Sequence, residues 1–222
     1  PAARTWMRML ETLQTTPLLF VALFAFAAAI TPGPNNIMLM SSGLTFGMRR
    51  TIPHMVGIAA GFLVLTVVLV LGVGAVLMAV PPFRYALLVG GTLFLCYLAY
   101  KTMTAPTDLA QRQSKRPLTF LEAAAFQFIN PKGWGFGLSY IALVTGVSPN
   151  GKLTFWIAIF AILIPQVATY ISAITWSGLG QFMARLIDSP KTVKAINIGL
   201  GLTLLAMIPL MLWSELDAIL KL

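Results

Sequence analysis

The stretch TPGPNN, residues 31–36, interrupts an apolar run that extends from Leu18 to Phe46. Two prolines remove backbone N–H donors, and the glycine between them adds a freely bending backbone, so helical hydrogen bonding cannot pass undisturbed through residues 32–34. In the hydrocarbon of a membrane, unpaired backbone groups are tolerated only where protein or a water-filled cavity meets them. The break therefore predicts a cavity at mid-membrane.

A second break, FINPKGWG at residues 128–135, interrupts the apolar run 118–146. Pro131 follows Pro32 by 99 residues, and each interrupted run is 29 residues long. An ordinary spanning helix needs only ~20 residues, so both runs have the excess that a broken helix requires. Paired, interrupted segments at matching positions in two halves are typical of secondary transporters, which hold their substrate near the midplane.

The same residues resemble a known family, the LysE/RhtB family of amino-acid exporters, over nearly the whole chain from about Leu18. The resemblance rests on TPGPNNIMLMSSGLTFG at residues 31–47, GIAAG at 57–61 and FQFINPKGW at 126–134. It implies a six-helix protein of the bacterial inner membrane that exports amino acids or close derivatives, driven by proton exchange and without a chemical cofactor.

Composition independently excludes most other classes of protein. Hydrophobic residues make up 58% of the chain and charged residues 9%, with a mean hydropathy of +0.87, which is typical of a polytopic membrane protein. The net charge of +9 could suggest a nucleic-acid partner. We exclude that reading, because the basic residues fall in the short connections between apolar runs. Cys96 has no second cysteine to pair with.

The predicted fold is all-α, with six transmembrane helices arranged as two three-helix repeats. Because each half has an odd number of spans, the second half enters the membrane from the opposite side, and the repeats must be inverted. The expected divisions are a tail at 1–17, which we retain in the mature protein because it lacks the pattern of a signal peptide, a first repeat at 18–103, a basic loop at 104–117, a second repeat at 118–213 and a tail at 214–222.

The distribution of basic residues predicts the orientation. With six spans, one side carries the smaller group of basic residues, Arg4, Arg8, Arg84, Lys152 and Lys221. The other side carries the larger group, Arg49, Arg50, Lys101, Arg112, Lys115, Arg116, Arg185, Lys191 and Lys194. Positive-inside bias places the larger group in the cytoplasm and both termini outside.

The two breaks also predict a binding site. The half-helices that follow them, 34–46 and 132–146, both begin at the membrane centre, where their free amides and positive dipole ends favour an anion such as an amino-acid carboxylate. A polar stripe on the fifth span adds two further candidates. The predicted substrate-binding residues are Pro32, Gly33, Pro34, Asn35, Asn36, Asn130, Pro131, Lys132, Gln166 and Tyr170.

Several of these residues have a structural alternative. Of Asn35 and Asn36, we expect one to satisfy backbone groups and the other to face the substrate. The stripe of Gln166 and Tyr170 faces either the pathway or other helices. Lys132 lies well inside the membrane without an acid in helical reach, so a substrate carboxylate could supply its counter-charge. The alternative is that it reaches water, or bonds to backbone carbonyls freed at the first break.

Proton coupling commonly uses an intramembrane carboxylate or histidine, which leaves Glu122 and His54 as candidates. Both lie near span ends and have an alternative as ordinary interfacial residues, which is the favoured interpretation for His54. Since no acid is expected at either break to receive a second ammonium, neutral amino acids are favoured over lysine or arginine.

The rival classes lack the residues they need. A cation exporter needs several ligands at depth, and an enzyme needs a nucleophile with a base or a metal cluster. We therefore predict no catalytic residue, no metal and no cofactor. A passive channel stays open, and so does self-association into a homo-oligomer. The expected partners are a small amino acid and the lipid bilayer.

Overall fold

The structure is a computed structural model that describes residues 17–72, 74, 76, 79–107, 115–148, 153–187 and 189–220. Within these residues it contains helices and their connections but no strand. The all-α prediction is therefore confirmed. In chain order the helices are α2 (Pro17–Ile30), α3 (Pro34–Phe46), α4 (Met48–Val70), α6 (Pro81–Met103), α8 (Phe120–Ile129), α9 (Pro131–Val147), α10 (Phe155–Leu186) and α11 (Pro190–Leu220).

Both predicted breaks are present. The helix α2 ends at Ile30 and α3 begins at Pro34, and the two helix axes differ by 54°. The helix α8 ends at Ile129 and α9 begins at Pro131. Each second half-helix starts on a proline, whose missing N–H is one that a helix start leaves unpaired anyway.

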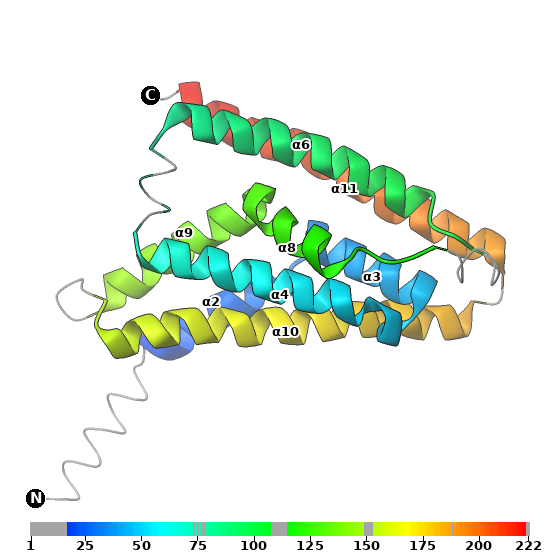
Figure 1. Cartoon of the computed structure of the whole chain (residues 1–222), viewed down its shortest axis with the longest axis horizontal. Coiled ribbons are helices and arrows are strands. Elements are labelled where there is room, and N and C mark those ends of the chain that lie inside the picture. The colour runs from blue at the N-terminus through cyan, green and yellow to red at the C-terminus, as the bar shows by residue number, and fades with distance from the viewer. Residues whose placement is uncertain are drawn as a thin grey trace, which may run out of the picture.

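The helices run along the long direction of the molecule, and each element of the second half runs opposite to its counterpart in the first (Figure 1). The segment α2–α3 leads to the end of the molecule where α4 begins, whereas α8–α9 leads back toward the other end (Figure 1). The helix α10 packs along α2 and α3, while α4 packs along α8 and α9. The helices α6 and α11 lie side by side (Figure 1).

Two glycines bring α4 against α8. A Cβ atom on Gly57 would lie 2.3 Å from the carbonyl oxygen of Phe120, and one on Gly61 would lie 2.4 Å from that of Ala124. Both distances are shorter than any real contact, so only hydrogen fits at these positions. The glycine pair thus lets α4 pack closely on the first half of the second broken segment.

Fewer spans qualify by length and composition than the six predicted. Four helices of the described chain are long and apolar enough to cross a membrane, and the bent pair α2 and α3 raises the number to five if it is one span. The second broken segment, α8 with 10 residues and α9 with 17, is not among these spans. The helices nevertheless establish a polytopic membrane protein.

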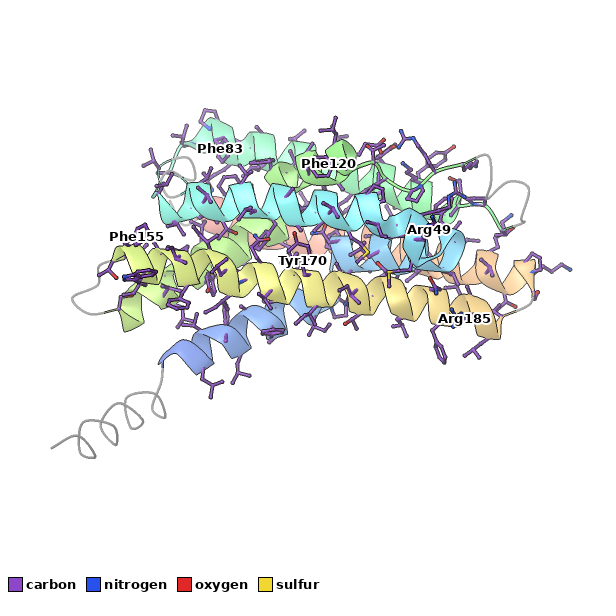
Figure 2. All side chains as sticks on the ribbon, turned by 60° about the horizontal axis from the view of Figure 1, so that its bottom comes forward. Arg49, Phe83, Phe120, Phe155, Tyr170 and Arg185 are labelled. Carbon is purple, nitrogen blue, oxygen red and sulfur yellow. The ribbon has the colours of Figure 1, made fainter. Side chains whose placement is uncertain are left out.

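Charge is concentrated at one end of the molecule. The described basic residues of the larger predicted group lie where α3, α6 and α10 end and where α4, α8 and α11 begin; Arg112 lies outside the described residues. Figure 2 shows Arg49 and Arg185 at this end, with Phe83 and Phe155 toward the other. Large apolar side chains such as Leu93, Leu163 and Ile174 are exposed between the ends, as a lipid-facing surface requires.

Candidate functional site

A cavity of about 70 Å³ lies between the two breaks. Its walls come from the end of α2, from α3, α4, α8, α9 and α10, so elements of both halves enclose it. Of the predicted site residues, six line this cavity: Gly33, Pro34, Asn35, Asn36, Asn130 and Lys132. The two breaks, about a hundred residues apart in sequence, therefore meet around one space.

Side chains from other elements satisfy the carbonyls that the first break frees. The Asn36 Nδ2 atom donates to the carbonyl oxygens of Ala29, at 2.7 Å, and Thr31, at 2.9 Å. The Ser172 Oγ atom donates to the same Ala29 oxygen at 2.8 Å, and it also reaches the Asn36 Oδ1 atom at 3.1 Å. Asn36 is therefore occupied with backbone, which is the structural role expected for one asparagine of the pair.

Lys132 connects the second break to the first. Its Nζ atom donates to the carbonyl oxygen of Thr31 at 2.9 Å. The lysine stem passes over Gly33, where a Cβ atom would lie 2.6 Å from Nζ and 2.8 Å from Cδ. Gly33 has an extended φ of −165°, which any residue adopts, so glycine is needed here for space and not for conformation. The bond to a freed carbonyl is the structural alternative considered for Lys132, and the same side chain lines the cavity.

Asn35 pairs with a residue that sequence reasoning missed. Its Nδ2 atom donates to Gln127 Oε1 at 2.9 Å, and Gln127 Nε2 donates back to Asn35 Oδ1 at 3.2 Å. Gln127 is buried and lines the cavity. Its signal in the sequence was a polar residue inside an apolar helix, one turn before Asn130. These two amide hydrogen bonds connect α3 to α8 beside the breaks.

Asn130 offers an unused acceptor. The residue is only 3% exposed and lines the cavity, yet its Oδ1 atom has no hydrogen-bond partner among the described residues. Its side chain does not cap α9, contrary to the capping role suggested by its position. Leaving a buried carbonyl unpaired costs about 1–3 kcal/mol, so a donor placed in the cavity would be favoured there.

The remaining predicted site residues lie elsewhere. Pro32 is exposed, and Pro131 packs against Gly91 of α6. The Gln166 amide, oriented to satisfy both groups, donates to the Ala59 carbonyl at 3.2 Å and accepts from the Leu63 N–H at 3.0 Å. Tyr170 is 46% exposed on the outer side of α10 and does not line the cavity.

The polar face of α10 that does meet the cavity carries Thr169 and Ser172. Neither was singled out from the sequence, because hydroxyl groups this small are common in membrane helices. Trp176, further along α10, donates from Nε1 to the carbonyl oxygen of Ile30 at 3.1 Å. The first break is thus closed by side chains of α3, α9 and α10.

Neither candidate for proton coupling lines this cavity. Glu122 forms a capping box with Thr119 at the start of α8, and its carboxylate pairs with the Arg116 guanidinium at 2.7 Å and the Lys101 ammonium at 4.0 Å. These contacts are those of a helix-capping and ion-pairing residue. His54 is buried in α4, on the side toward the basic end.

The chemistry of the cavity is simple. Lys132 supplies one cation, Asn130 one free acceptor, and Phe62, Phe136 and Ile58 apolar wall. No acidic side chain of the described chain lines it. Such a cavity suits a small molecule that carries a negative group, a hydrogen-bond donor and an apolar part.

Comparisons with known proteins agree with this arrangement. No solved structure matches the chain significantly. The "Cysteine/O-acetylserine efflux protein" of Escherichia coli strain K12 is 31% identical over 192 residues, covering 85% of this chain and 95% of the relative. The proteins of the same name from Shigella flexneri, at 31% over 192 residues, and Escherichia coli O157:H7, at 32% over 193 residues, match to the same extent.

The family profile described as "LysE type translocator" matches residues 26–212, a range that includes both breaks and every residue around the cavity. With this match and with relatives above 30% identity over most of the chain, the protein belongs to the LysE type translocator family.

Proposed function

We propose that this chain exports small neutral amino acids, and that the amino acid binds in the cavity between the two breaks with its carboxylate on Lys132. The observation that carries the proposal is that the cavity contains one cation and no acidic residue among those described, and that Lys132 is held there only by the neutral carbonyl of Thr31. As a translocator, the protein is a transporter and not an enzyme, and its apolar helices make it a multi-pass protein of the bacterial inner membrane.

The carboxylate would bind by adding to, or replacing, the Thr31 carbonyl. A lysine ammonium has three donors, and one of them is used by Thr31. The bond to Thr31 already has one charged partner, and a carboxylate would add the opposite charge, which strengthens the attraction in surroundings of low dielectric constant. A substrate carboxylate therefore competes well for Lys132, and its arrival would weaken a contact that joins the two breaks.

The α-ammonium would donate to Asn130, whose Oδ1 atom is free and buried. Because no acid lines the cavity, a second ammonium, as in lysine, would find no counter-charge there. The names of the relatives support this preference, since cysteine and O-acetylserine are both small amino acids without net charge. A cation exporter is disfavoured, because the described residues contain no group of three or more His, Cys, Asp or Glu that could hold a metal ion.

We further propose that the two halves are inverted repeats that move against each other around this cavity. Two features support it: counterpart segments run in opposite directions (Figure 1), and α4 packs on the broken segment of the second half as α10 packs on that of the first. The midplane is then the level of the breaks, and the basic end faces the cytoplasm with both termini outside.

Proton exchange is the proposed driving force. Since Glu122 is engaged in its capping box and with Arg116, His54 is the better of the two candidates for a proton carrier. The buried imidazole of His54 has no hydrogen-bond partner among the described residues. A pH gradient imposed across proteoliposomes should then drive uptake or release of substrate against its own gradient.

Counterflow in proteoliposomes tests the proposal. Vesicles loaded with unlabelled cysteine should transiently accumulate labelled cysteine, whereas vesicles loaded with lysine should not accumulate labelled lysine. A channel would equilibrate both without accumulation, because only a carrier accelerates exchange. Accumulation of lysine but not of cysteine would overturn the assigned substrate class.

A further inference from the structure

A second cavity, of about 100 Å³, lies at the basic end of the molecule. It is formed by the cytoplasm-proximal turns of α3 and α4, by the end of α6 and by residues 115–118 before α8. The central cavity does not share these residues, although both cavities are lined by α3 and α4. The proposed amino-acid site does not include this second space, although His54 in its wall is the proposed proton carrier.

His54 lines the second cavity and has hydrogen-bonding groups left unsatisfied by the described residues. The side chain is 1% exposed, and neither Nδ1 nor Nε2 has a hydrogen-bond partner among the described residues. A neutral imidazole always carries one N–H donor and one nitrogen acceptor. Two hydroxyl groups that line the same cavity are already engaged: Ser41 donates to Asn197 at 3.0 Å, and Ser42 bonds to Thr51 at 2.8 Å. A ligand that offers both a hydrogen-bond acceptor and a hydrogen-bond donor would therefore suit this cavity.

The charges around the cavity are unbalanced. Lys101, Lys115 and Arg116 line it. The only acid that pairs with any of them in the described chain is Glu122, which contacts Arg116 and Lys101 but does not line the cavity. Among the described residues, the only hydrogen-bond partner of the Lys115 Nζ atom is the Thr104 carbonyl, at 3.5 Å. Within the described part of the chain, three cations stand against one acid, and this excess of positive charge favours an anionic group on the ligand.

The two cavities follow one another along α3 and α4. Leu39 and Ile58 line the central cavity, while Ser42 and His54 line the second, about one helical turn away on each helix. Leu39 and Ile58 are fully buried and belong to one apolar cluster with Met55, Ala123 and Ala173. An apolar layer therefore separates two polar spaces in series.

We propose that the second cavity binds a free amino acid at the cytoplasmic side before it reaches the central site, with its carboxylate toward Lys115 and its ammonium on the side of the His54 imidazole. An anion without a proton, such as chloride, can only accept hydrogen bonds, whereas an amino acid brings an anionic acceptor and an ammonium donor in one molecule. The substrate class rests on the proposed function.

The chain has a single histidine, which makes the test specific. Protein labelled with ¹⁵N-histidine in nanodiscs of zwitterionic lipid would be titrated with cysteine at constant pH, and the imidazole resonances followed by NMR. The experiment would be repeated with Lys132→Met, which removes the cation of the central site. A saturable shift of the His54 resonances in both proteins is expected.

Two surface variants identify the cavity that causes the shift. Lys115→Gln removes one cation from its rim and should weaken the apparent affinity roughly threefold to fivefold. Lys191→Gln removes an exposed cation from the start of α11, which does not line the cavity, and should leave the affinity unchanged. If both variants weakened the apparent affinity equally, the effect would come from the general surface charge, and the proposal would be overturned.

Other outcomes also overturn it. If the shift vanishes in Lys132→Met, His54 only senses the central site. If cysteine gives no shift but phosphatidylglycerol does, the occupant is a lipid headgroup, and if neither does, the cavity holds water only. Counterflow separates this failure from failure of the proposed function: transport of cysteine without a His54 shift refutes the second site alone, while a shift without transport supports the second site and refutes the export of cysteine.

Discussion

Lys132 is the residue on which the proposed site depends most. On insertion scales a lysine at the centre of a membrane helix costs about 2.5–3.5 kcal/mol. A hydrogen bond from a charged donor contributes about 1.5–3 kcal/mol, so the Thr31 carbonyl offsets much of that cost without neutralising the charge. Because the lysine stays charged, it can bind a substrate carboxylate. The absence of a side chain at Gly33 leaves room for the lysine to extend from the second break to the Thr31 carbonyl.

Replacing Lys132 should impair binding without impairing the fold. In Lys132→Met the charged hydrogen bond to substrate is lost, so the apparent affinity in counterflow should fall roughly 10- to 100-fold, the equivalent of about 1.5–3 kcal/mol. Lys132→Arg should be partly active, since it keeps the charge but crowds Gly33. Membrane insertion and thermal stability, measured on the same preparations, serve as controls. Unaltered affinity in the methionine variant would make Lys132 purely structural.

Glu122 should prove dispensable for proton coupling. Glu122→Gln keeps a side-chain acceptor for the capping box and removes the ion pairs with Arg116 and Lys101, partly exposed pairs that are worth about 0–1 kcal/mol each. We expect the variant to retain transport driven by a pH gradient, measured in proteoliposomes, whereas Glu122→Ala should lose about 0.5–2 kcal/mol of stability along with the cap. Loss of gradient-driven transport in the glutamine variant would assign the coupling proton to Glu122.

At the scale of elements, the breaks were predictable because their causes are local. Proline cannot donate, so Pro34 and Pro131 fix where α3 and α9 begin, whatever surrounds them. The partners of the freed carbonyls were not predictable in the same way. Ser172 and Trp176 come from α10, and periodicity alone does not say which face of that helix meets the breaks. For the same reason the sequence drew attention to Tyr170, which is exposed, and passed over Gln127.

The contact between α4 and α8 gives a prediction about an element pair. Gly61→Ala would place a methyl group 2.4 Å from the Ala124 carbonyl oxygen, which is backbone and cannot move aside without shifting a helix. Overpacking of this kind costs about 1–3 kcal/mol, so the melting temperature of the purified protein should fall. Gly135→Ala is the matched control, because a Cβ atom there meets nothing within 4 Å. An equal effect of both substitutions would show that helix propensity, and not packing, determines stability here.

At the scale of the whole molecule, composition and the paired breaks were sufficient to predict an all-helical membrane protein with a cavity between its halves. The number of membrane spans was harder to predict from the sequence. Two half-helices form one span only if they follow one another across the bilayer. By itself, each of α8 and α9 is shorter than the ~20 residues that a spanning helix needs. The number of spans therefore depends on the angle between the two half-helices at each break, and hydropathy along the chain does not predict that angle.

The asymmetry of charge between the two ends yields the last prediction, which concerns orientation. Thr104, after α6, lies at the end that carries Arg49 and Arg50, and Ala79, before α6, lies at the opposite end; both are exposed. Each would be replaced by cysteine in a Cys96→Ser background, because Cys96 is itself exposed on α6. Positive-inside bias places the basic end in the cytoplasm. An impermeant thiol reagent added to intact cells should therefore label Ala79→Cys readily, and should label Thr104→Cys only after the cells are permeabilised. The reverse pattern would place the basic end outside, and the second cavity would then open away from the cytosol, so that it could not receive an amino acid on its way out.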